Sequence, residues 1–174
     1  VPQKGELMGF LEEVAQSFSD LAERKGVEFS YTANCSQLNV LFDHDKVERI
    51  LFNLLSNAFK FTPQGGRVSV TADVTLEPTL ATLELKVKDT GIGMPPGQLE
   101  KIFERFFQSD EPGHYVNQGS GIGLAITREF VKLHNGAINV ESEPDKGTCF
   151  TVRLPFTPAG QAEETAITAQ PQKL

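Results

Sequence analysis

The chain has 174 residues, of which 39% are hydrophobic and 22% charged, a composition that suits one folded domain with a buried core. Its 16 basic and 23 acidic side chains leave a formal charge of −7, which argues against a nucleic-acid surface because phosphate backbones require clustered Lys and Arg. The two cysteines, Cys35 and Cys149, do not have the spacing of a metal site, and they imply no disulfide, which fits a reducing compartment. No apolar run reaches the ~18 residues that a membrane span needs.

The first quarter of the chain predicts one helix followed by two strands. Apolar residues recur at helical spacing over 6–25, and Gly26 is expected to end that helix. The segments 27–33 and 38–43 are short and apolar, as strands are.

The second quarter predicts a longer helix and a pair of strands. A buried Val, Ile and Leu stripe runs through 45–61, and Asp45 with Glu48 three residues later resembles a capping box at the start of that helix. Apolar residues then alternate over 68–74 and again over 83–87, which predicts two half-buried strands.

The rest of the chain continues in mixed order. A short helix is predicted over 98–108, and the polar loop that follows it, 109–120, is long enough to suggest a function. The helical pattern returns over 122–133, and two final strands are predicted at 137–142 and 148–156.

This order of elements predicts an α+β domain, with one mixed sheet and helices packed on one of its faces. After Phe156 the composition shifts to Ala, Gln, Thr, Glu and Pro. We therefore expect residues 1–157 to form the domain and residues 158–174 to be a mobile tail or linker.

Three glycines, Gly119, Gly121 and Gly123, lead into the helix at 122–133. Bare backbone N–H groups at a helix entry favour anions such as phosphate. The dinucleotide fingerprint fails because its last spacing is wrong and a polar loop stands where a strand is needed, and the Walker loop fails because no Lys follows. Taken alone, the run is equally consistent with a flexible helix entry.

A second candidate is Asp89, which follows the strand at 83–87 and precedes Gly91 and Gly93. Its carboxylate can accept a hydrogen bond from the exocyclic amine of adenine, whereas guanine presents a carbonyl oxygen that a carboxylate rejects. The alternative is an Asx-turn with no further role.

A third candidate lies on the helix at 45–61, where Asn53, Asn57 and Lys60 share one face. Asn is a mediocre helix former, so two of them in one helix call for a reason. Their amide oxygens suit a phosphate-bound Mg²⁺, which prefers oxygen ligands, and Lys60 can contact phosphate. The alternative is a solvated polar stripe.

In this order the signals strongly resemble the catalytic, ATP-binding domain of sensor histidine kinases, in the wider group with DNA gyrase and MutL. The resemblance covers roughly residues 6–156. The asparagine box is matched by Asn53, Asn57, Lys60 and Phe61, and the first glycine box by Asp89, Gly91 and Gly93. The phenylalanine box is matched by Phe103, Arg105, Phe106 and Phe107. The second glycine box is matched by Gly119, Gly121, Gly123 and Leu124, and the last element by Gly147, Thr148 and Phe150.

The resemblance implies a two-layer α/β sandwich in which ATP lies between the two central helices and a lid formed by about 108–120. It implies that Asn57 ligates Mg²⁺ with support from Asn53, and that Asp89 holds the adenine amine directly and through water, near Thr148. The residues expected to contact the nucleotide are Asn53, Asn57, Lys60, Phe61, Asp89, Gly91, Gly93, Phe107, Gly119, Gly121, Gly123, Leu124 and Thr148, with Lys60 and Arg105 as phosphate contacts.

Two positions bear on the reaction. The resemblance implies that gyrase-like ATPases carry a Glu at the position of Asn53, where it activates water for hydrolysis. A neutral Asn cannot act as a general base. That difference favours phosphoryl transfer to another group over hydrolysis. Gln108 follows Phe107, whereas many relatives carry an Arg there that can reach the terminal phosphate.

The histidines His44, His114 and His134 lie outside any stretch that resembles the family's acceptor motif, and we expect all three at the surface. The resemblance therefore implies that the acceptor belongs to an upstream dimerisation and histidine phosphotransfer domain or to a partner chain. It further implies a homodimeric parent, a response regulator or receiver domain as partner, and the cytoplasmic part of a membrane-bound sensor. The alternatives are an autonomous gyrase-type ATPase and a degenerate nucleotide-binding scaffold.

Overall fold

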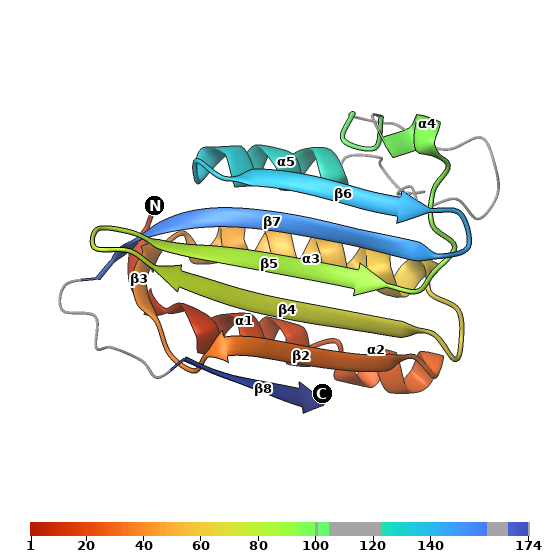
Figure 1. The fold of residues 1–174 in the computed structure, drawn as a ribbon, viewed down its shortest axis with the longest axis horizontal. Helices are drawn as coiled ribbons and strands as arrows, with labels where there is room; N and C mark the ends of the chain where they lie inside the picture. The colour runs from red at the N-terminus through yellow and green to blue at the C-terminus, as the bar shows by residue number, and fades with distance from the viewer. Residues whose placement is uncertain (100, 105–122, 160–166, 174) are drawn as a thin grey trace.

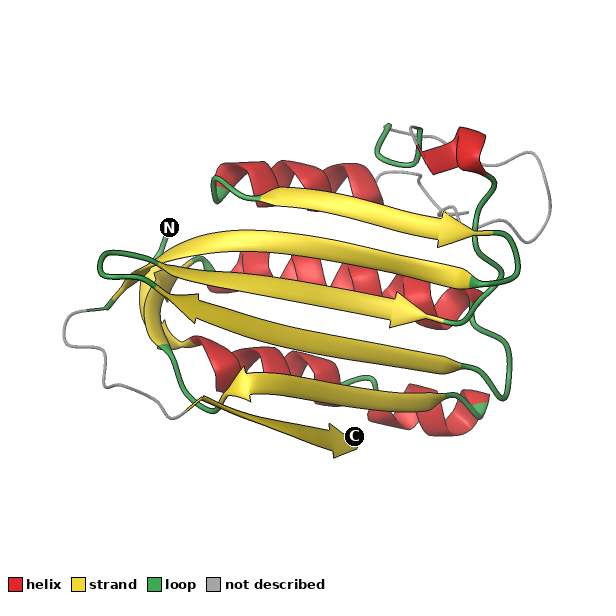
Figure 2. Ribbon diagram, in the orientation of Figure 1, coloured by secondary structure: helices red, strands yellow, loops and turns green. Residues whose placement is uncertain are grey.

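The computed structural model describes residues 1–99, 101–104, 123–159 and 167–173. These residues form a mixed sheet with helices packed on one face, which confirms the predicted α+β sandwich (Figure 1; Figure 2). The strands are β1 (Gln3–Glu6), β2 (Glu28–Cys35), β3 (Asn39–Phe42), β4 (Arg67–Leu76), β5 (Ala81–Asp89), β6 (Ala137–Glu143), β7 (Gly147–Pro158) and β8 (Ile167–Lys173). They lie in the order β1-β3-β7-β5-β4-β2-β8. Strand β6 also pairs with β7, along the edge of β7 that faces away from β5. Only β2 and β4 pair in parallel among the described strands.

The helix layer is built around one long central helix. The described helices are α1 (Leu7–Gln16), α2 (Ser19–Lys25), α3 (His44–Phe61), α4 (Pro96–Leu99) and α5 (Gly123–Leu133). In the layer behind the sheet, α3 packs against α1 on one side and against α5 on the other (Figure 1). The two predicted helices that carry asparagine and glycine motifs are therefore neighbours.

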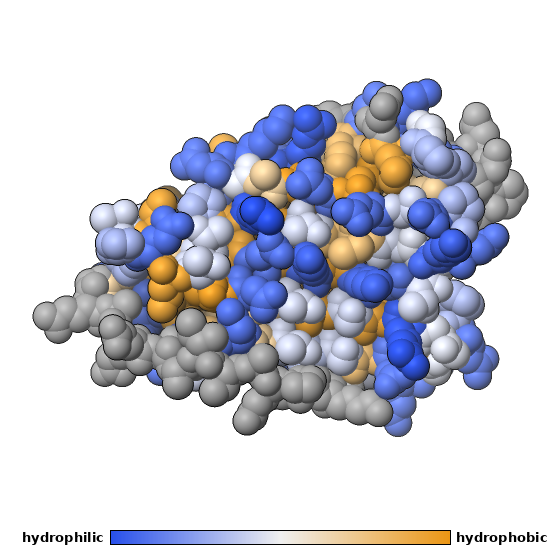
Figure 3. Space-filling model, viewed as in Figure 1, coloured by the Kyte–Doolittle hydropathy of each residue, from blue (hydrophilic) through white to orange (hydrophobic). Residues whose placement is uncertain are grey.

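The core lies between the sheet and the helices. On β5 the alternate residues Leu83, Leu85 and Val87 are buried toward the helices. Each such side chain contributes about 1.5–3 kcal/mol when it leaves water. The opposite face carries polar and charged groups, among them the ion pair between Arg153 and Glu84 at 2.8 Å, and Figure 3 shows hydrophilic side chains over much of that face.

The helix predicted over 6–25 is wrong in one respect, because it is two helices. The chain leaves helical hydrogen bonding after α1, where the Ser17 hydroxyl donates to Val14 O at 2.6 Å, and restarts at α2. The Phe18 side chain at the break is buried, and its ring stacks on Phe59 at 5.7 Å. Both helices bury the same side of the chain, so the apolar period runs through the break. Gly26 ends α2 in the left-handed conformation, as predicted.

The predicted N-cap of α3 is also wrong, by two residues. Asp43, directly after β3, is the N-cap, and its Oδ1 accepts from the Lys46 backbone N–H at 3.1 Å. Asp45 lies in the first turn instead, where its charge suits the helix dipole. The sequence offers two Asp residues two positions apart, and the end of β3 decides between them.

The helix predicted over 98–108 is shorter where it is described. Only Pro96–Leu99 form helix α4, and residues 101–104 continue as turns. The remaining predicted positions, from 105 onward, lie outside the described residues.

The C-terminal segment differs from the expected mobile tail. Strand β7 runs to Pro158, and β8 (Ile167–Lys173) pairs antiparallel with the edge strand β2. Strand β1, which the sequence pattern does not predict, pairs antiparallel with β3. Cys35 and Cys149, which both lie in the described part of the chain, are free cysteines.

Candidate functional site

The two asparagines of α3 occupy the expected face of the helix. Asn57 is only 8% exposed, and Asn53, one turn earlier, is half-buried. A solvated polar stripe therefore does not describe them. It does describe Lys60, which is exposed in the last turn of the helix, with its Nζ 5.5 Å from the centre of the Phe61 ring.

Asn53 ties α3 to the first turn of α5. Its Nδ2 donates to Gly123 O at 3.3 Å and to Thr127 Oγ1 at 3.2 Å. Leu124 is buried beside this contact region, at 2% exposure. The asparagine motif and the end of the second glycine motif, 70 positions apart in sequence, therefore meet directly.

Asp89 is the last residue of β5 and is 1% exposed. Its Oδ1 accepts from the Gly91 backbone N–H at 2.8 Å, so the Asx-turn that the sequence allows is present. Burying a carboxylate is costly unless it is well hydrogen-bonded, and a turn does not require the burial. The turn and a ligand role are thus compatible, since a carboxylate accepts several hydrogen bonds.

Close packing leaves no room for a side chain at Gly91 or Gly93, the two glycines that follow Asp89. A Cβ on Gly91 would lie 2.6 Å from Phe61 O at the end of α3. At Gly93, where φ is +68°, a Cβ would lie 1.8 Å from Glu143 O at the end of β6. These close approaches hold the Asp89 loop between α3 and the β6–β7 turn.

Thr148 lies directly beside Asp89 on the neighbouring strand. The two residues are register partners on β7 and β5, and Thr148 is 2% exposed. Thr148 Oγ1 lies 2.8 Å from Ser142 Oγ, which also accepts from the Met94 N–H at 2.8 Å and donates to Gly147 O at 3.0 Å. The structure therefore brings Thr148 to Asp89, as expected.

Sequence reasoning missed Ser142 and Thr127. Both hydroxyls bind groups that are distant in sequence, and neither residue stands out by spacing or by neighbouring glycines. An accurate pairing of β6 with β7 could have placed Ser142 opposite Thr148. No comparable signal exists for Thr127.

The phenylalanine motif is described only at its start. The Phe103 ring packs 6.3 Å from the Phe150 ring, and the Arg128 guanidinium lies 5.7 Å over it. The predicted residues Arg105, Phe106, Phe107, Gln108, His114, Gly119 and Gly121, and the predicted lid at 108–120, lie outside the described residues.

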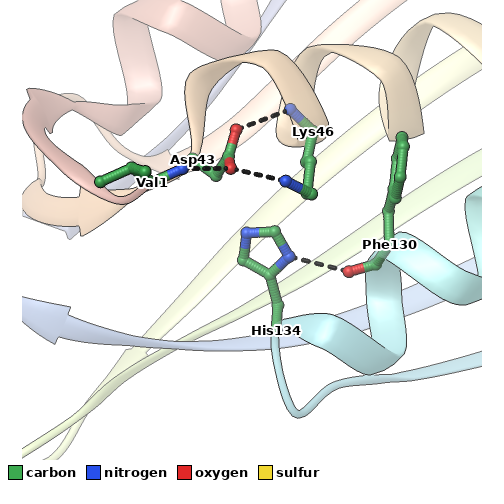
Figure 4. Close-up of polar contacts among 5 residues, drawn as sticks. All are labelled: Val1, Asp43, Lys46, Phe130 and His134. Carbon is green, nitrogen blue, oxygen red and sulfur yellow. Dashed lines mark hydrogen bonds and ion pairs between the residues drawn. The ribbon is translucent and has the colours of Figure 1, made fainter.

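The other end of α3 carries an ion cluster (Figure 4). Asp43 Oδ2 lies 3.0 Å from both the Val1 amine and Lys46 Nζ. Partial burial alone would raise the pKa of the Asp43 carboxyl, but the hydrogen bonds from Lys46 and the Val1 amine outweigh it and hold that pKa well below its usual range. Lys46 Nζ also lies 5.8 Å from the Phe130 ring. Helix α5 therefore contacts α3 both at the start of α5, through Gly123, and near the end of α5, through Phe130.

The expectation that the histidines lie at the surface is only partly right. His44 is half-buried with its ring stacked on Phe42 at 3.9 Å. His134 is half-buried as well, with Nδ1 2.8 Å from Phe130 O (Figure 4). Both rings are held by packing within the domain.

The chain is similar to a large set of signalling proteins. A family model described as histidine kinase-, DNA gyrase B- and HSP90-like ATPase matches residues 42–158. Hybrid signal transduction histidine kinase D of Dictyostelium discoideum is 40% identical over 146 residues, which are 83% of this chain and 9% of that protein. Sensor histidine kinase WalK of Bacillus subtilis is 39% identical over 137 residues, 79% of this chain and 22% of that protein. The chain thus spans less than a quarter of the length of these curated relatives.

Solved structures give the same result. The full-length ShkA in complex with AMPPNP is 31% identical with a TM-score of 0.75, over 91% of this chain and 32% of that one. The nucleotide-free catalytic domain of histidine kinase ThkA is 26% identical with a TM-score of 0.76, over 91% of this chain and 99% of that one. ThkA in complex with the response regulator TrrA is 25% identical with a TM-score of 0.71, over 90% of this chain and 42% of that one.

Proposed function

The chain belongs to the family of histidine kinase-, DNA gyrase B- and HSP90-like ATPases, and on that premise we propose that it binds Mg-ATP and transfers the γ-phosphoryl group to a histidine on a separate domain. The observation that carries the proposal is the buried Asp89 carboxylate at the end of β5, opposite Thr148. The resemblance assigns the adenine contact to this residue, and its burial at the end of a strand supports that assignment.

Adenine recognition rests on hydrogen-bond polarity. An ionised carboxylate only accepts hydrogen bonds, so Asp89 suits the N6 amine of adenine and opposes the O6 carbonyl of guanine. A site whose buried polar group would lose its partner discriminates strongly between two such ligands. The similar ShkA binds AMPPNP, an adenine nucleotide, in its solved complex.

Asn57 and Asn53 would hold Mg²⁺ through their amide oxygens, together with the phosphates and water. Mg²⁺ keeps several waters and needs only one or two protein oxygens, so two Asn residues fit its donor preference. Among the described residues, no cluster of three or more His, Cys, Asp or Glu side chains suited to a metal occurs. When bound, the ion would neutralise charge on the phosphates.

The neutral residue at position 53 favours transfer over hydrolysis. Asn53 cannot remove a proton from water, so the nucleophile must be activated elsewhere. Phosphoryl transfer depends mostly on positioning and on charge stabilisation, to which Lys60 and Arg105 would contribute. The acceptor histidine would lie on an upstream dimerisation and phosphotransfer domain, in a homodimeric parent.

Two further aspects follow from the same proposal. A response regulator or receiver domain would take the phosphoryl group next, and ThkA has been solved with such a partner. Since ATP is supplied inside the cell, the domain would work on the cytoplasmic side of the membrane. Among the described residues, none of the helices has the length and apolar character to cross a bilayer.

A titration with a fluorescent adenine nucleotide tests the site. Wild-type protein should bind the probe in a Mg²⁺-dependent manner, and Asp89→Asn should weaken it by roughly tenfold or more, because an amide can present its N–H₂ to the base amine. Asn57→Ala should remove most of the Mg²⁺ dependence. Unchanged affinity in Asp89→Asn would refute the adenine assignment.

Phosphoryl transfer is tested by adding labelled ATP and a separately purified dimerisation domain from a similar kinase. Label on the added histidine, lost in Asn57→Ala, is the expected result. Phosphate release without any acceptor would instead favour an autonomous ATPase, and absence of nucleotide binding would favour a scaffold.

A further inference from the structure

A buried hydroxyl lies between the two helices that carry the site. Thr127, in the second turn of α5, is 0% exposed and donates from Oγ1 to Gly123 O at 2.8 Å. Asn53 Nδ2 on α3 lies 3.2 Å from the same Oγ1 and 3.3 Å from the same Gly123 O. These three residues form a closed set of hydrogen bonds, which we call the Asn53 clamp.

The donors and acceptors of the clamp can be assigned one by one. A threonine hydroxyl has one hydrogen, and Thr127 uses it on Gly123 O, so Oγ1 can only accept from Asn53. Gly123 O is a carbonyl and also only accepts. The two acceptors lie 2.8 Å from each other on the same side of Asn53 Nδ2, so one N–H of the amide can be shared between them.

This assignment fixes which way the Asn53 amide points. With Nδ2 bound to α5, Oδ1 occupies the other branch of the planar amide, directed away from the two acceptors. Without the clamp the amide could turn over, because the two orientations differ only in which atom meets which partner. Gly123 is the last glycine of the second glycine motif, so the clamp also sets the start of α5 against α3.

We propose that Thr127 is a positioning residue for the metal–nucleotide site, which orients the Asn53 amide oxygen toward Mg²⁺ and makes position 53 selective for an amide over a carboxylate. The inference rests on the proposed function. A carboxylate at position 53 could not donate to Gly123 O, and it could bind Thr127 Oγ1 only if that hydroxyl turned its hydrogen away from Gly123 O, which would then lose both of its clamp hydrogen bonds. The clamp therefore gives a structural reason why a carboxylate is disfavoured relative to an amide at this position.

The test uses three variants of the full chain. Thr127→Val keeps the shape and burial but removes the acceptor, whereas Thr127→Ser keeps the hydroxyl. Val131→Ala is the matched control, since Val131 lies one turn later on α5, is 0% exposed, and its truncation loosens the helix packing away from Asn53. Each is titrated with a fluorescent adenine nucleotide with and without Mg²⁺, and the Asn53 side-chain amide signals are recorded by NMR without nucleotide.

We expect Thr127→Val to reduce the gain in affinity from Mg²⁺ by roughly three- to tenfold, the value of one oriented hydrogen bond. Thr127→Ser should restore most of that gain, and Val131→Ala should leave it unchanged even where stability falls. In the NMR spectra only Thr127→Val should shift the Asn53 amide protons.

Two results would overturn the proposal, and they differ from each other. If wild-type protein gains affinity from Mg²⁺ and Thr127→Val gains equally, the clamp does not position the metal ligand, while the proposed function stands. If wild-type protein shows no Mg²⁺-dependent binding, the proposed function fails and this role of Thr127 fails with it.

Discussion

Gly93 and Gly65 share a left-handed backbone conformation but have different surroundings. At Gly65, where φ is +87°, an added Cβ meets nothing within 4 Å. At Gly93 it would lie 1.8 Å from Glu143 O, which is backbone and cannot rotate away. Position 93 is therefore constrained by strain and by contact, and position 65 by strain alone.

We predict that Gly65→Ala lowers the free energy of unfolding by about 1–2 kcal/mol, the cost of left-handed geometry. Gly93→Ala should cost that amount plus about 1–3 kcal/mol for forcing the loop away from β6. Urea unfolding of both variants measures the difference. Equal losses would mean that the close approach of the Asp89 loop to β6 is incorrect.

The Asp43 carboxylate couples stability to pH. Its pKa is lower in the folded protein than in the unfolded chain, so its contribution is fully present above the unfolded pKa of about 3.9 and is lost as pH falls toward the folded value. Asp43→Asn keeps a good N-cap but removes the charge that Lys46 and the Val1 amine contact.

We predict that Asp43→Asn reduces the loss of stability between about pH 5 and pH 2, because one titrating group is gone. At pH 7 the variant should be less stable than wild type, and the two should converge in acid. Thermal unfolding across this pH range is the measurement. Parallel curves for the two proteins would show that Asp43 contributes no linkage.

Some site residues could be predicted from the sequence because their chemistry is visible locally. Asn57 and Asp89 are polar residues in places where helix and strand patterns call for others, and the structure buries both. Ser142 and Thr127 could not be found in this way, because a strand or helix tolerates Ser or Thr and their partners come from other elements.

At the scale of elements, the junction between α1 and α2 depends on one aromatic side chain. Phe18 is 5% exposed and contacts the rings of both Phe59 and Phe52, at 5.7 Å and 5.3 Å. Phe52 belongs to the same cluster but is 42% exposed. The two phenylalanines thus form a natural comparison of buried and exposed packing against α3.

We predict that Phe18→Ala lowers the free energy of unfolding by about 3–5 kcal/mol, whereas Phe52→Ala costs about 1 kcal/mol, the value of an aromatic pair. Chemical denaturation of the two variants decides this. If Phe52→Ala were the more costly change, the exposed face of α3 would be covered by something in solution.

The helix break itself could not be read from the sequence. An amphipathic period reports which side of the chain is buried, and α1 and α2 bury the same side, so the period passes through Ser17 and Phe18 unchanged. The helix at 45–61 was predicted well for the opposite reason: a single stripe of apolar residues faces the sheet for its whole length.

At the scale of the molecule, the site exists because the topology joins segments that are distant in sequence. Asn53 meets Gly123, Gly91 packs on Phe61, and Asp89 pairs with Thr148. Sheet order and helix packing make these contacts, so residue spacing alone could not predict them, and the proximity of Thr148 to Asp89 was expected only through the resemblance to the family. The edge strands β1 and β8 were not predicted, because short or polar edge strands show little of the hydrophobic alternation that predicts a strand.

The edge strand β8 leads to a prediction for the whole molecule. It covers β2, and β2 and β4 separate it from β5, which ends at Asp89. Removing residues 160–174 should therefore expose the β2 edge without altering the nucleotide site. We expect a lower melting temperature, by about 2–4 °C for each kcal/mol of lost pairing, and more self-association through the open edge.

Nucleotide affinity should stay within about twofold of the full chain, a change of less than 1 kcal/mol. Thermal unfolding, light scattering and nucleotide titration of the truncated and full chains provide the three measurements. An unchanged melting temperature would mean that β8 adds nothing to the fold. A large loss of affinity together with a lower melting temperature would mean that the sheet transmits the loss of an edge strand across β2 and β4 to Asp89, and the site would then depend on the whole sheet.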